Sequence, residues 1–431
     1  MFLEVLFMKF RGETIKFATS LKKQQISQER KLVQDINNLE STQLGQSNYT
    51  LLEDKKLELE DLRKEKVRGH MIRSRLQWLN EGEKPTSFFC KLESKHCMEK
   101  TMKKIQTNSG NIITDQKEIL KEIQNFYSKL FKSKDYNLEN FNYKEEIKRA
   151  NVKRIPKIQL GQEISVLELG TALKKMKNSK SPGIDGISVD FLKVFWGKLK
   201  FFIVNAINSC YSKGVMSTSM RQAIITCIPK GNKDRKLIKN WRPISLLTVI
   251  YKLASMVIAD RIKPLLNNII SESQSGFIPG RSIGDCTRLI YDLMAYTEKR
   301  CIPGLLMQID FEKAFDSVSW KFLYNVLESF GFDENLIKWV KLFNTDIKAY
   351  VSQSGFMSDP VSVERGCRQG DPLSPYLFIL VAEILCCLIN NSPNVIGLSI
   401  GSTMFKLTQF ADDTTLILDG STSSLQAALN I

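Results

Sequence analysis

Two short apolar segments, about a hundred residues apart, each meet acidic residues, and this pairing constrains the fold more than any other feature of the chain. Residues 304–310 predict a buried strand that ends on Asp310. Residues 407–418 predict a hairpin with its turn at residues 411–413. A carboxylate beside buried apolar residues is costly unless a cation or hydrogen-bond donors meet it. We therefore expect the fold to bring the two segments together around a cation.

The adjacent acids Asp412 and Asp413 are expected to have unequal roles. Neighbouring side chains in extended backbone face opposite sides, so only one of the two can join Asp310 at the same ion. Carboxylates are the ligands that Mg²⁺ prefers, and two Mg²⁺ ions about 3.5–4 Å apart commonly support phosphoryl transfer. Asp-rich turns are also common without a metal, so the pair alone leaves both interpretations open.

Two further acids lie close to Asp310 and are given structural roles. Asp316 stands where the N-cap of the next predicted helix belongs, and Glu312 is interpreted as a solvated turn residue. Asp310 has no such local explanation at the end of its apolar segment. It is therefore the candidate functional acid of residues 310–316.

The charge of the chain is unevenly distributed. The formal net charge is +16, residues 151–280 hold 21 Lys and Arg against 7 Asp and Glu, and residues 281–431 hold 12 against 17. Such an excess indicates a polyanionic partner, either nucleic acid or an anionic membrane, although a solvated basic surface has the same composition. A basic middle beside an acidic end is typical of a polyanion-binding cleft that faces a cation site.

Two loops add polar groups to this pattern. Residues 222–245 predict a hairpin whose tip and return strand carry Lys230 and Arg242, a combination suited to gripping a triphosphate. Gln369 and Gly370 precede a long apolar helix, where glycine permits close approach of the backbone to a planar ligand or template strand. Taken alone, this second loop could be purely structural.

Cysteine usage and hydropathy predict the compartment. The nine cysteines form no C-x-x-C pair and the chain has only two histidines, so we expect neither a zinc site nor a disulfide-linked partner. The N-terminus lacks the pattern of a secretory signal. The longest apolar run, residues 376–389, includes Glu383 and suits a buried helix rather than a membrane span. We expect an intracellular protein of the cytoplasm or nucleus, neither secreted nor bound to a membrane.

Seven motifs in sequence order resemble the reverse transcriptase domain of LINE-type non-LTR retrotransposons. The resemblance runs from about residue 70 to the end of the chain. The motifs are RSRLQWLNEGEKPTSFF, KSPGIDGIS, IPK with NWRPISLL, QSGFIPGRS, IDFEKAFDSV, RGCRQGDPLSPYLF and FADD. Aromatic residues in the first of these, Trp78, Phe88 and Phe89, can either stack on bases or lie in the core.

The resemblance implies roles for the acidic residues and a cofactor. Asp310 and Asp412 would be metal ligands, and Asp413 would be the adjacent catalytic carboxylate. The implied cofactor is a pair of Mg²⁺ ions, for which Mn²⁺ can substitute. Phe315 would be the sugar gate, an aromatic ring beneath the ribose that excludes a 2′-hydroxyl by its volume.

The resemblance also implies residues that bind substrate. Lys230 and Arg242 would contact the incoming triphosphate, while Gln369 and Gly370 would lie beside the nucleotide and the template. The implied reaction is two-metal nucleotidyl transfer, in which a primer 3′-hydroxyl attacks the α-phosphorus of a dNTP. The implied partners are an RNA template, a DNA primer and dNTPs.

The implied fold is α+β, a right-hand polymerase with fingers and a palm whose antiparallel sheet is packed against helices, preceded by a helical N-terminal extension. The chain ends shortly after Asp413, and we expect a truncated product that lacks both the endonuclease domain and the thumb of the family. The expected divisions are a helical linker or extension at 1–70, a helical basic pre-fingers region at 71–150, basic fingers at 151–280, and a palm, truncated before the thumb, at 281–431.

Three functions are weighed. The first is an RNA-directed DNA polymerase (reverse transcriptase). The second is a catalytically inert, truncated retrotransposon remnant that only binds nucleic acid. The third is another two-metal palm enzyme, such as a nucleotide cyclase or an RNA polymerase, which the order of the motifs and Phe315 disfavour. Loss of Mg²⁺-dependent dNTP incorporation on substitution of Asp412 distinguishes the first from the second.

Overall fold

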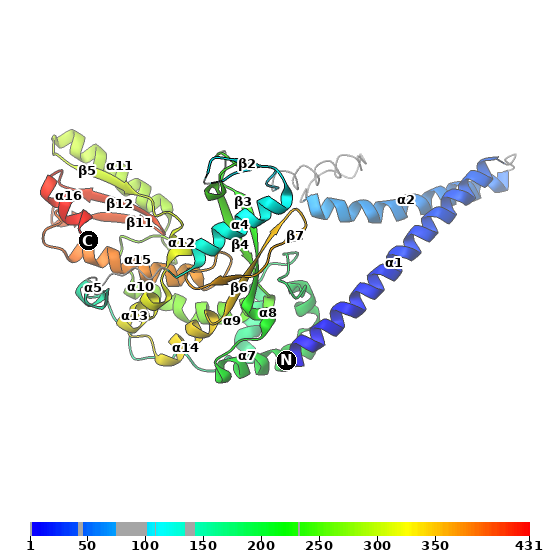
Figure 1. Cartoon of the computed structure of the whole chain (residues 1–431), viewed down its shortest axis with the longest axis horizontal. Helices are drawn as coiled ribbons and strands as arrows, with labels where there is room; N and C mark the ends of the chain where they lie inside the picture. The colour runs from blue at the N-terminus through cyan, green and yellow to red at the C-terminus, as the bar shows by residue number, and fades with distance from the viewer. Residues whose placement is uncertain (1, 42–45, 75–100, 108, 134–142, 232) are drawn as a thin grey trace.

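The computed structural model of the chain describes residues 2–41, 46–74, 101–107, 109–133, 143–231 and 233–431. These residues form a helix-rich body and a long helical hairpin that projects away from it (Figure 1). The described helices are α1 (Phe2–Ser41), α2 (Gln46–Ser74), α4 (Gln116–Phe131), α5 (Tyr143–Ala150), α6 (Val166–Lys175), α7 (Val189–Lys213), α8 (Thr218–Arg221), α9 (Val249–Ile262), α10 (Leu266–Ile269), α11 (Ile283–Arg300), α12 (Ala314–Ser317), α13 (Trp320–Phe330), α14 (Glu334–Phe343), α15 (Ser374–Asn391) and α16 (Thr422–Leu429), with 3₁₀ turns η1 (Ile238–Asn240) and η2 (Lys263–Leu265).

Strands in the described ranges form two larger sheets and two small hairpins. One small hairpin pairs β1 with β2 and the other pairs β9 with β10. The strands are β1 (Ile105–Gln106), β2 (Ile112–Ile113), β3 (Gln222–Pro229), β4 (Trp241–Leu246), β5 (Leu305–Ile309), β6 (Ile347–Gln353), β7 (Phe356–Met357), β8 (Val361–Val363), β9 (Leu398–Ile400), β10 (Thr403–Phe405), β11 (Leu407–Phe410) and β12 (Asp413–Leu418). The mixture of helices and mainly antiparallel strands confirms the predicted α+β class.

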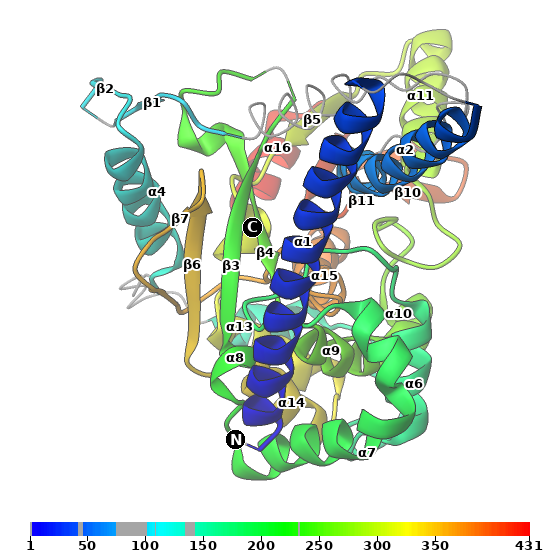
Figure 2. The same cartoon turned by 90° about the vertical axis from the view of Figure 1, so that its right-hand side faces the viewer.

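The N-terminal helix α1 runs out from the body and α2 runs back toward it, and the two pack together near their far ends (Figure 1). In the view of Figure 2, α1 is seen along its length. The small core between the two helices contains Leu32 and Ile36 of α1 with Leu52 and Leu59 of α2. The start of α1 docks on the body, where the rings of Phe2 and Phe202 lie 5.9 Å apart between centroids. The predicted helical N-terminal extension is therefore observed.

The larger sheet has the strand order β4-β3-β6-β7, with β8 also paired to β6. β3 and β4 form the predicted antiparallel hairpin, in which Ile228 pairs with Arg242. β3 also runs parallel to β6, so strands from both sides of residue 280 share one sheet. The division into fingers and palm at residues 280/281 remains a prediction, and this sheet extends across it.

The smaller sheet, in the order β11-β12-β5, is antiparallel throughout. Leu407, Leu416 and Leu418 on one face pack against α15 in a buried cluster. Ile417 on the other face packs with Leu293 of α11. Side chains alternate between the two faces along each strand, so both faces of the sheet carry apolar contacts. The sheet therefore lies between α15 on one face and α11 on the other (Figure 1).

Helix α15 is the apolar helix predicted from residues 376–389. Its 18 residues have a mean hydropathy of 1.6, and among the described helices it alone is long and apolar enough to cross a membrane. However, 56% of this helix is buried inside the fold, and Glu383 on it is 1% exposed with Ser271 as a hydrogen-bond partner. These features are those of a core helix.

Candidate active site

The three predicted catalytic acids lie at one end of the smaller sheet. Asp310 follows directly on β5, and β5 pairs with β12 so that Ile309 lies opposite Thr414. Asp413 begins β12 and pairs with Phe410, which leaves Ala411 and Asp412 as the two residues of the hairpin turn. The pairing of β5 with β12 thus brings together acids that lie about a hundred residues apart in the sequence.

The proximity of the three acids affects the pKa of Asp412. Its carboxyl is half-buried, and burial raises its pKa above the ordinary value of 3.8, with further increases from the carboxylates of Asp413 and Asp310. Arg242 and a backbone hydrogen bond oppose the rise in its pKa. Three acids that repel one another, with one cationic side chain nearby, form a site that favours positive charge.

The prediction that β5 is a buried strand is wrong. Among the described residues β5 is an edge strand of its sheet, and every second side chain on it is exposed. Asp310 and Asp413 are both exposed, so desolvation by an apolar strand does not make Asp310 costly. The mutual proximity of the carboxylates, rather than burial of Asp310, is what distinguishes this site.

The donor chemistry of the acids fits a hard divalent cation. No group of three or more His, Cys, Asp or Glu within the described ranges is arranged to hold a metal ion by itself. Mg²⁺, however, is commonly bound through one or two carboxylates, with water and substrate phosphates supplying the other ligands. Asp310 and Asp412 are suited to this kind of site, because a cation between them would relieve the repulsion that raises the pKa of Asp412.

The β3–β4 hairpin carries both basic residues that are predicted to bind the triphosphate. Lys230 follows β3, with its backbone N–H donating to the Asn240 carbonyl at 2.9 Å, while Arg242 is exposed on β4. The influence of Arg242 on the pKa of Asp412 places this guanidinium within electrostatic reach of the acids. The structure therefore brings Arg242 close to the acids.

Lys313 lies close to the predicted site, although no role is assigned to it from the sequence. It lies in the turn before α12 with a left-handed φ of +54°, and its Nζ donates to the Trp241 carbonyl at 2.9 Å. Burial lowers the pKa of Lys313, and neighbouring Lys230 lowers it further. Lys313 thus ties the turn after Asp310 to β4, next to Arg242. Nothing in the local sequence around Lys313 predicts its hydrogen bond to Trp241, which lies 72 positions away.

Phe315 is held in a fixed orientation by other aromatic rings. Its ring stacks on Phe378 of α15, with centroids 4.1 Å apart and an interplanar angle of 18°. Phe277 approaches its edge, with centroids 6.4 Å apart. The Phe315 side chain is only partly exposed, and it lies in the short helix α12, five residues after Asp310.

The loop that carries Gln369 and Gly370 is held between β4 and the α12 turn. The Gln369 carbonyl accepts a hydrogen bond from Ser245 N–H at 2.9 Å, and its side-chain Nε2 donates to Asp316 Oδ2 at 3.3 Å. Gly370 has a φ of +106°, and a Cβ there would lie 2.8 Å from the Ser245 carbonyl oxygen. Glycine is therefore required at this close approach.

The N-cap role predicted for Asp316 is wrong. Asp316 lies within α12 and is 3% exposed, whereas Ser319 caps the following helix α13 by accepting from Phe322 N–H. Burial raises the pKa of Asp316 to about 6, against the lowering effect of Lys313, Lys230 and Arg365. The predicted role of Glu312 as an exposed turn residue agrees with the structure.

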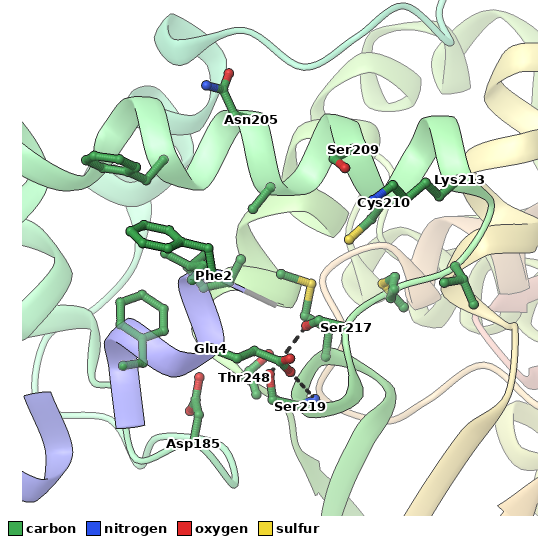
Figure 3. A pocket seen from close by; sticks show the side chains of 18 residues that line it. Phe2, Glu4, Asp185, Asn205, Ser209, Cys210, Lys213, Ser217, Ser219 and Thr248 are labelled. Carbon is green, nitrogen blue, oxygen red and sulfur yellow. Dashed lines mark hydrogen bonds between the residues drawn. The ribbon is translucent and has the colours of Figure 1, made fainter. Parts of the chain in front are cut away.

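Two cavities differ in their relation to the acids. One of about 400 Å³ adjoins the site and is lined by Asp412, Gln409, Phe311 and apolar residues of α13 and α15. A larger cavity of about 580 Å³ lies instead where the start of α1 meets α7 and α8 (Figure 3). Glu4 in this second cavity accepts from Ser219 N–H at 2.8 Å, which fixes the start of α1. None of the predicted site residues lines the larger cavity.

The motif at residues 73–89 falls largely outside the described residues, and so do its aromatic residues Trp78, Phe88 and Phe89. The other six motifs lie in the described residues. Three of them supply Asp310, Asp412, Asp413, Lys230, Arg242 and Lys313.

Comparison with known proteins gives a consistent result. Residues 228–431 match the family described as reverse transcriptase (RNA-dependent DNA polymerase). The chain is 30% identical over 368 residues to the transposon TX1 uncharacterized 149 kDa protein of Xenopus laevis. The aligned region covers 84% of this chain and 28% of that protein.

Two further relatives come from Drosophila melanogaster. The retrovirus-related Pol polyprotein from type-2 retrotransposable element R2DM is 28% identical over 255 residues, covering 59% of this chain and 23% of that protein. The probable RNA-directed DNA polymerase from transposon BS is 28% identical over 239 residues, covering 52% and 25%. The chain spans about a quarter of the length of these curated relatives. These matches confirm the resemblance indicated by the sequence motifs.

Proposed function

We propose that this chain, which carries a reverse transcriptase domain of the non-LTR retrotransposon type, is an RNA-directed DNA polymerase. Its substrates would be an RNA template, a DNA primer and dNTPs. The observation that carries the proposal is the convergence of Asp310, Asp412 and Asp413 at one end of the β11-β12-β5 sheet, with Arg242 in electrostatic reach.

Asp310 and Asp412 would hold the divalent cations, and Mg²⁺ is the ion that these hard oxygen ligands favour. When bound, a pair of such ions supplies positive charge to the attacking and leaving oxygens of an in-line displacement. Asp412 lies in the turn and Asp413 begins the strand after it, so Asp413 would act from the side of the cation site. The unequal roles proposed for Asp412 and Asp413 follow from these different backbone positions.

The basic residues would bind the triphosphate of the incoming nucleotide. Lys230 and Arg242 lie on the β3–β4 hairpin, and the bond from Lys313 to the Trp241 carbonyl fixes that hairpin relative to the acids. A guanidinium binds phosphate oxygens in a bidentate manner, whereas an ammonium acts as a compact charge. The leaving pyrophosphate would therefore be stabilised by two cationic side chains on a hairpin whose backbone is held in place before substrate binds.

Phe315 would exclude a 2′-hydroxyl from the sugar site. Its stacking on Phe378 prevents the ring from turning aside, so a larger sugar would have to displace two packed aromatic side chains. Gln369 and Gly370 would lie beside the nucleotide and template, where the bond to Asp316 orients the Gln369 side chain. Selection of dNTPs over rNTPs would thus depend on packing behind the gate as well as on the gate itself.

By this proposal the β11-β12-β5 sheet with its helices is the palm, and the β3–β4 hairpin belongs to the fingers of a right-hand polymerase. The fingers would occupy residues 151–280 and the palm residues 281–431, following the basic and acidic parts of the sequence. The sheet shared by β3 and β6 would make fingers and palm one continuous framework.

The test is primer extension on an RNA template with dNTPs and Mg²⁺, with Asp412→Ala compared with the unsubstituted chain. Loss of a ligand carboxylate is expected to reduce incorporation by more than about 100-fold, since even supporting residues of metal sites cost 10–100-fold. Asp359→Asn, which removes an exposed carboxylate from the loop before β8, is the matched control and should extend normally.

The alternative functions give different results in the same assay. RNA binding that weakens with salt, without incorporation and unchanged in Asp412→Ala, would contradict the polymerase proposal and indicate a nucleic-acid-binding protein. Incorporation of rNTPs as efficiently as dNTPs would contradict the role of Phe315 and favour an RNA polymerase.

A further inference from the structure

Gln274 contacts the catalytic turn with every polar atom of its side chain. Its Oε1 accepts from the backbone N–H of Ala411 at 2.8 Å and from that of Gly276 at 2.8 Å. Its Nε2 donates to the Ala411 carbonyl at 3.2 Å. Gln274 is 0% exposed, so these bonds do not compete with water. One buried amide therefore pairs with both backbone polar groups of the residue that precedes Asp412.

The turn needs such support because its backbone is strained. Ala411 has a φ of +56°, in the left-handed region that costs a residue with a Cβ about 1–2 kcal/mol. Asp412 follows immediately, and the carboxylates of Asp413 and Asp310 repel it. Without an external partner, both effects favour a different conformation of Ala411, which would redirect the Asp412 side chain.

The loop that carries Gln274 is itself anchored to β11. Gln409 N–H donates to the Ser273 carbonyl at 2.7 Å, and Ser275 N–H donates to the Gln409 carbonyl at 2.9 Å. Gly276 approaches so closely that a Cβ there would lie 2.3 Å from Ala411 N. The loop therefore forms a short parallel bridge to the strand that leads into the turn.

The other side of the loop is fixed to the protein core. The Arg281 guanidinium donates to the Gln274 carbonyl at 2.7 Å and to the Ile270 carbonyl at 3.1 Å. Glu383 on the core helix α15 accepts from Ser271 N–H at 2.9 Å. The position of Gln274 is thus set by partly buried contacts at both ends of residues 270–281, which support the turn.

We propose that Gln274 is a positioning residue that holds Ala411 in its left-handed conformation and thereby aims the Asp412 carboxylate at the metal site. The inference deepens the proposed polymerase function and rests on it, because it assigns Asp412 to cation binding. Gln274 does not touch substrate in this role. It acts through two backbone groups of Ala411.

The test uses Gln274→Met, which preserves side-chain length and removes all three hydrogen bonds. Gln353→Met is the matched control, because Gln353 is also a buried glutamine in a strand context and its Nε2 has no partner among the described residues. Thermal unfolding of both variants is measured first. The full chain is used throughout.

The first readout is Mn²⁺ binding, measured from the electron paramagnetic resonance signal of free Mn²⁺ without any nucleotide. Binding that Asp412→Ala removes defines the site. The dissociation constant of that site should rise by about 10-fold or more in Gln274→Met, as for other residues that orient metal ligands, and should not change in Gln353→Met. An unchanged dissociation constant in a folded Gln274→Met variant would overturn the proposal.

The second readout is hydrogen–deuterium exchange of single amides in the unsubstituted chain, which needs no variant to fold. The Ala411 amide lies outside the β11–β12 ladder, yet the Gln274 bond should slow its exchange well below that of a free turn amide. Exchange at the rate of a free amide would refute the role of Gln274.

The third readout separates this inference from the proposed function. In primer extension, Gln274→Met should lower kcat and leave the KM for dNTP unchanged, whereas Arg242→Ala should raise that KM. If the unsubstituted chain extends no primer but Gln274→Met still binds Mn²⁺ more weakly, the positioning role is supported and the polymerase function is contradicted. Normal extension and normal Mn²⁺ binding in Gln274→Met support the function and contradict the positioning role.

Discussion

The buried carboxyl of Asp316 makes a quantitative prediction about stability and pH. Burial raises its pKa from 3.8 to about 6, so the folded chain holds this proton more tightly than the unfolded chain does. Each pKa unit is worth about 1.4 kcal/mol, which gives a total of roughly 3 kcal/mol for ionising Asp316 in the fold. The sign follows from linkage. The unfolding free energy falls as pH rises from about 4 through about 6, and the loss is complete above pH 6.

The perturbation is Asp316→Asn, which keeps an oxygen acceptor for Gln369 and removes the titration. Between pH 4.5 and pH 7.5 the unfolding free energy of the unsubstituted chain should fall by about 2 kcal/mol relative to the variant, since part of the roughly 3 kcal/mol is already lost at pH 4.5. All other groups titrate alike in both chains, so the difference isolates Asp316.

The assay is urea denaturation of both chains at the two pH values, with the exposed Asp359→Asn as the matched control. The control variant should follow the unsubstituted chain within about 0.5 kcal/mol, as surface substitutions usually do. A difference between the unsubstituted chain and Asp316→Asn that stays constant from pH 4.5 to pH 7.5 would refute the reasoning. Asp316 would then be ionised in the fold without cost, through stronger pairing with Lys313 than its burial allows.

Two further predictions concern packing at the site. Gly276→Ala should destabilise the fold by about 1–3 kcal/mol in urea denaturation, because its Cβ would lie 2.3 Å from Ala411 N. The matched Gly197→Ala, on the exposed face of α7 with nothing within 4 Å, should be neutral or stabilising by up to about 1 kcal/mol, and equal effects would contradict the steric argument. Phe315→Ala should reduce discrimination between dCTP and CTP by about 10-fold or more in kcat/KM, whereas Phe356→Ala, which removes an exposed ring on β7, should retain it. Unchanged discrimination in Phe315→Ala would exclude it as the gate.

Local features of the sequence predicted the elements that carry the site. The apolar run before Asp310, the hairpin around residues 411–413 and the basic hairpin at 222–245 all form where expected. Each of these depends on contacts between residues that are near in sequence, such as side-chain alternation and turn composition. The resemblance of the motifs was equally visible, since it requires only their order along the chain.

The errors arose where burial depends on distant segments. β5 is an edge strand with an exposed Asp310, although its composition resembles that of a buried strand. Asp316 has the residue type and position of an N-cap, yet it is buried beneath the loop that carries Gln369. Residue type and spacing do not specify which segment will cover a side chain, so neither outcome could be obtained from local pattern.

By itself, the sequence determined which residues have the chemistry for the proposed reaction, because carboxylates, cationic side chains and an aromatic ring are properties of residue type. Only the tertiary structure decided how they are held. Lys313 reaches Trp241 and Gln274 reaches Ala411 across 72 and 137 positions of the chain, respectively. Such hydrogen bonds form because packing of the whole core removes water from both partners and fixes their distance, and no local sequence pattern encodes that distance. Asp412, adjacent to Asp413 in the sequence, therefore lies in a turn that is supported by a loop far away in the chain.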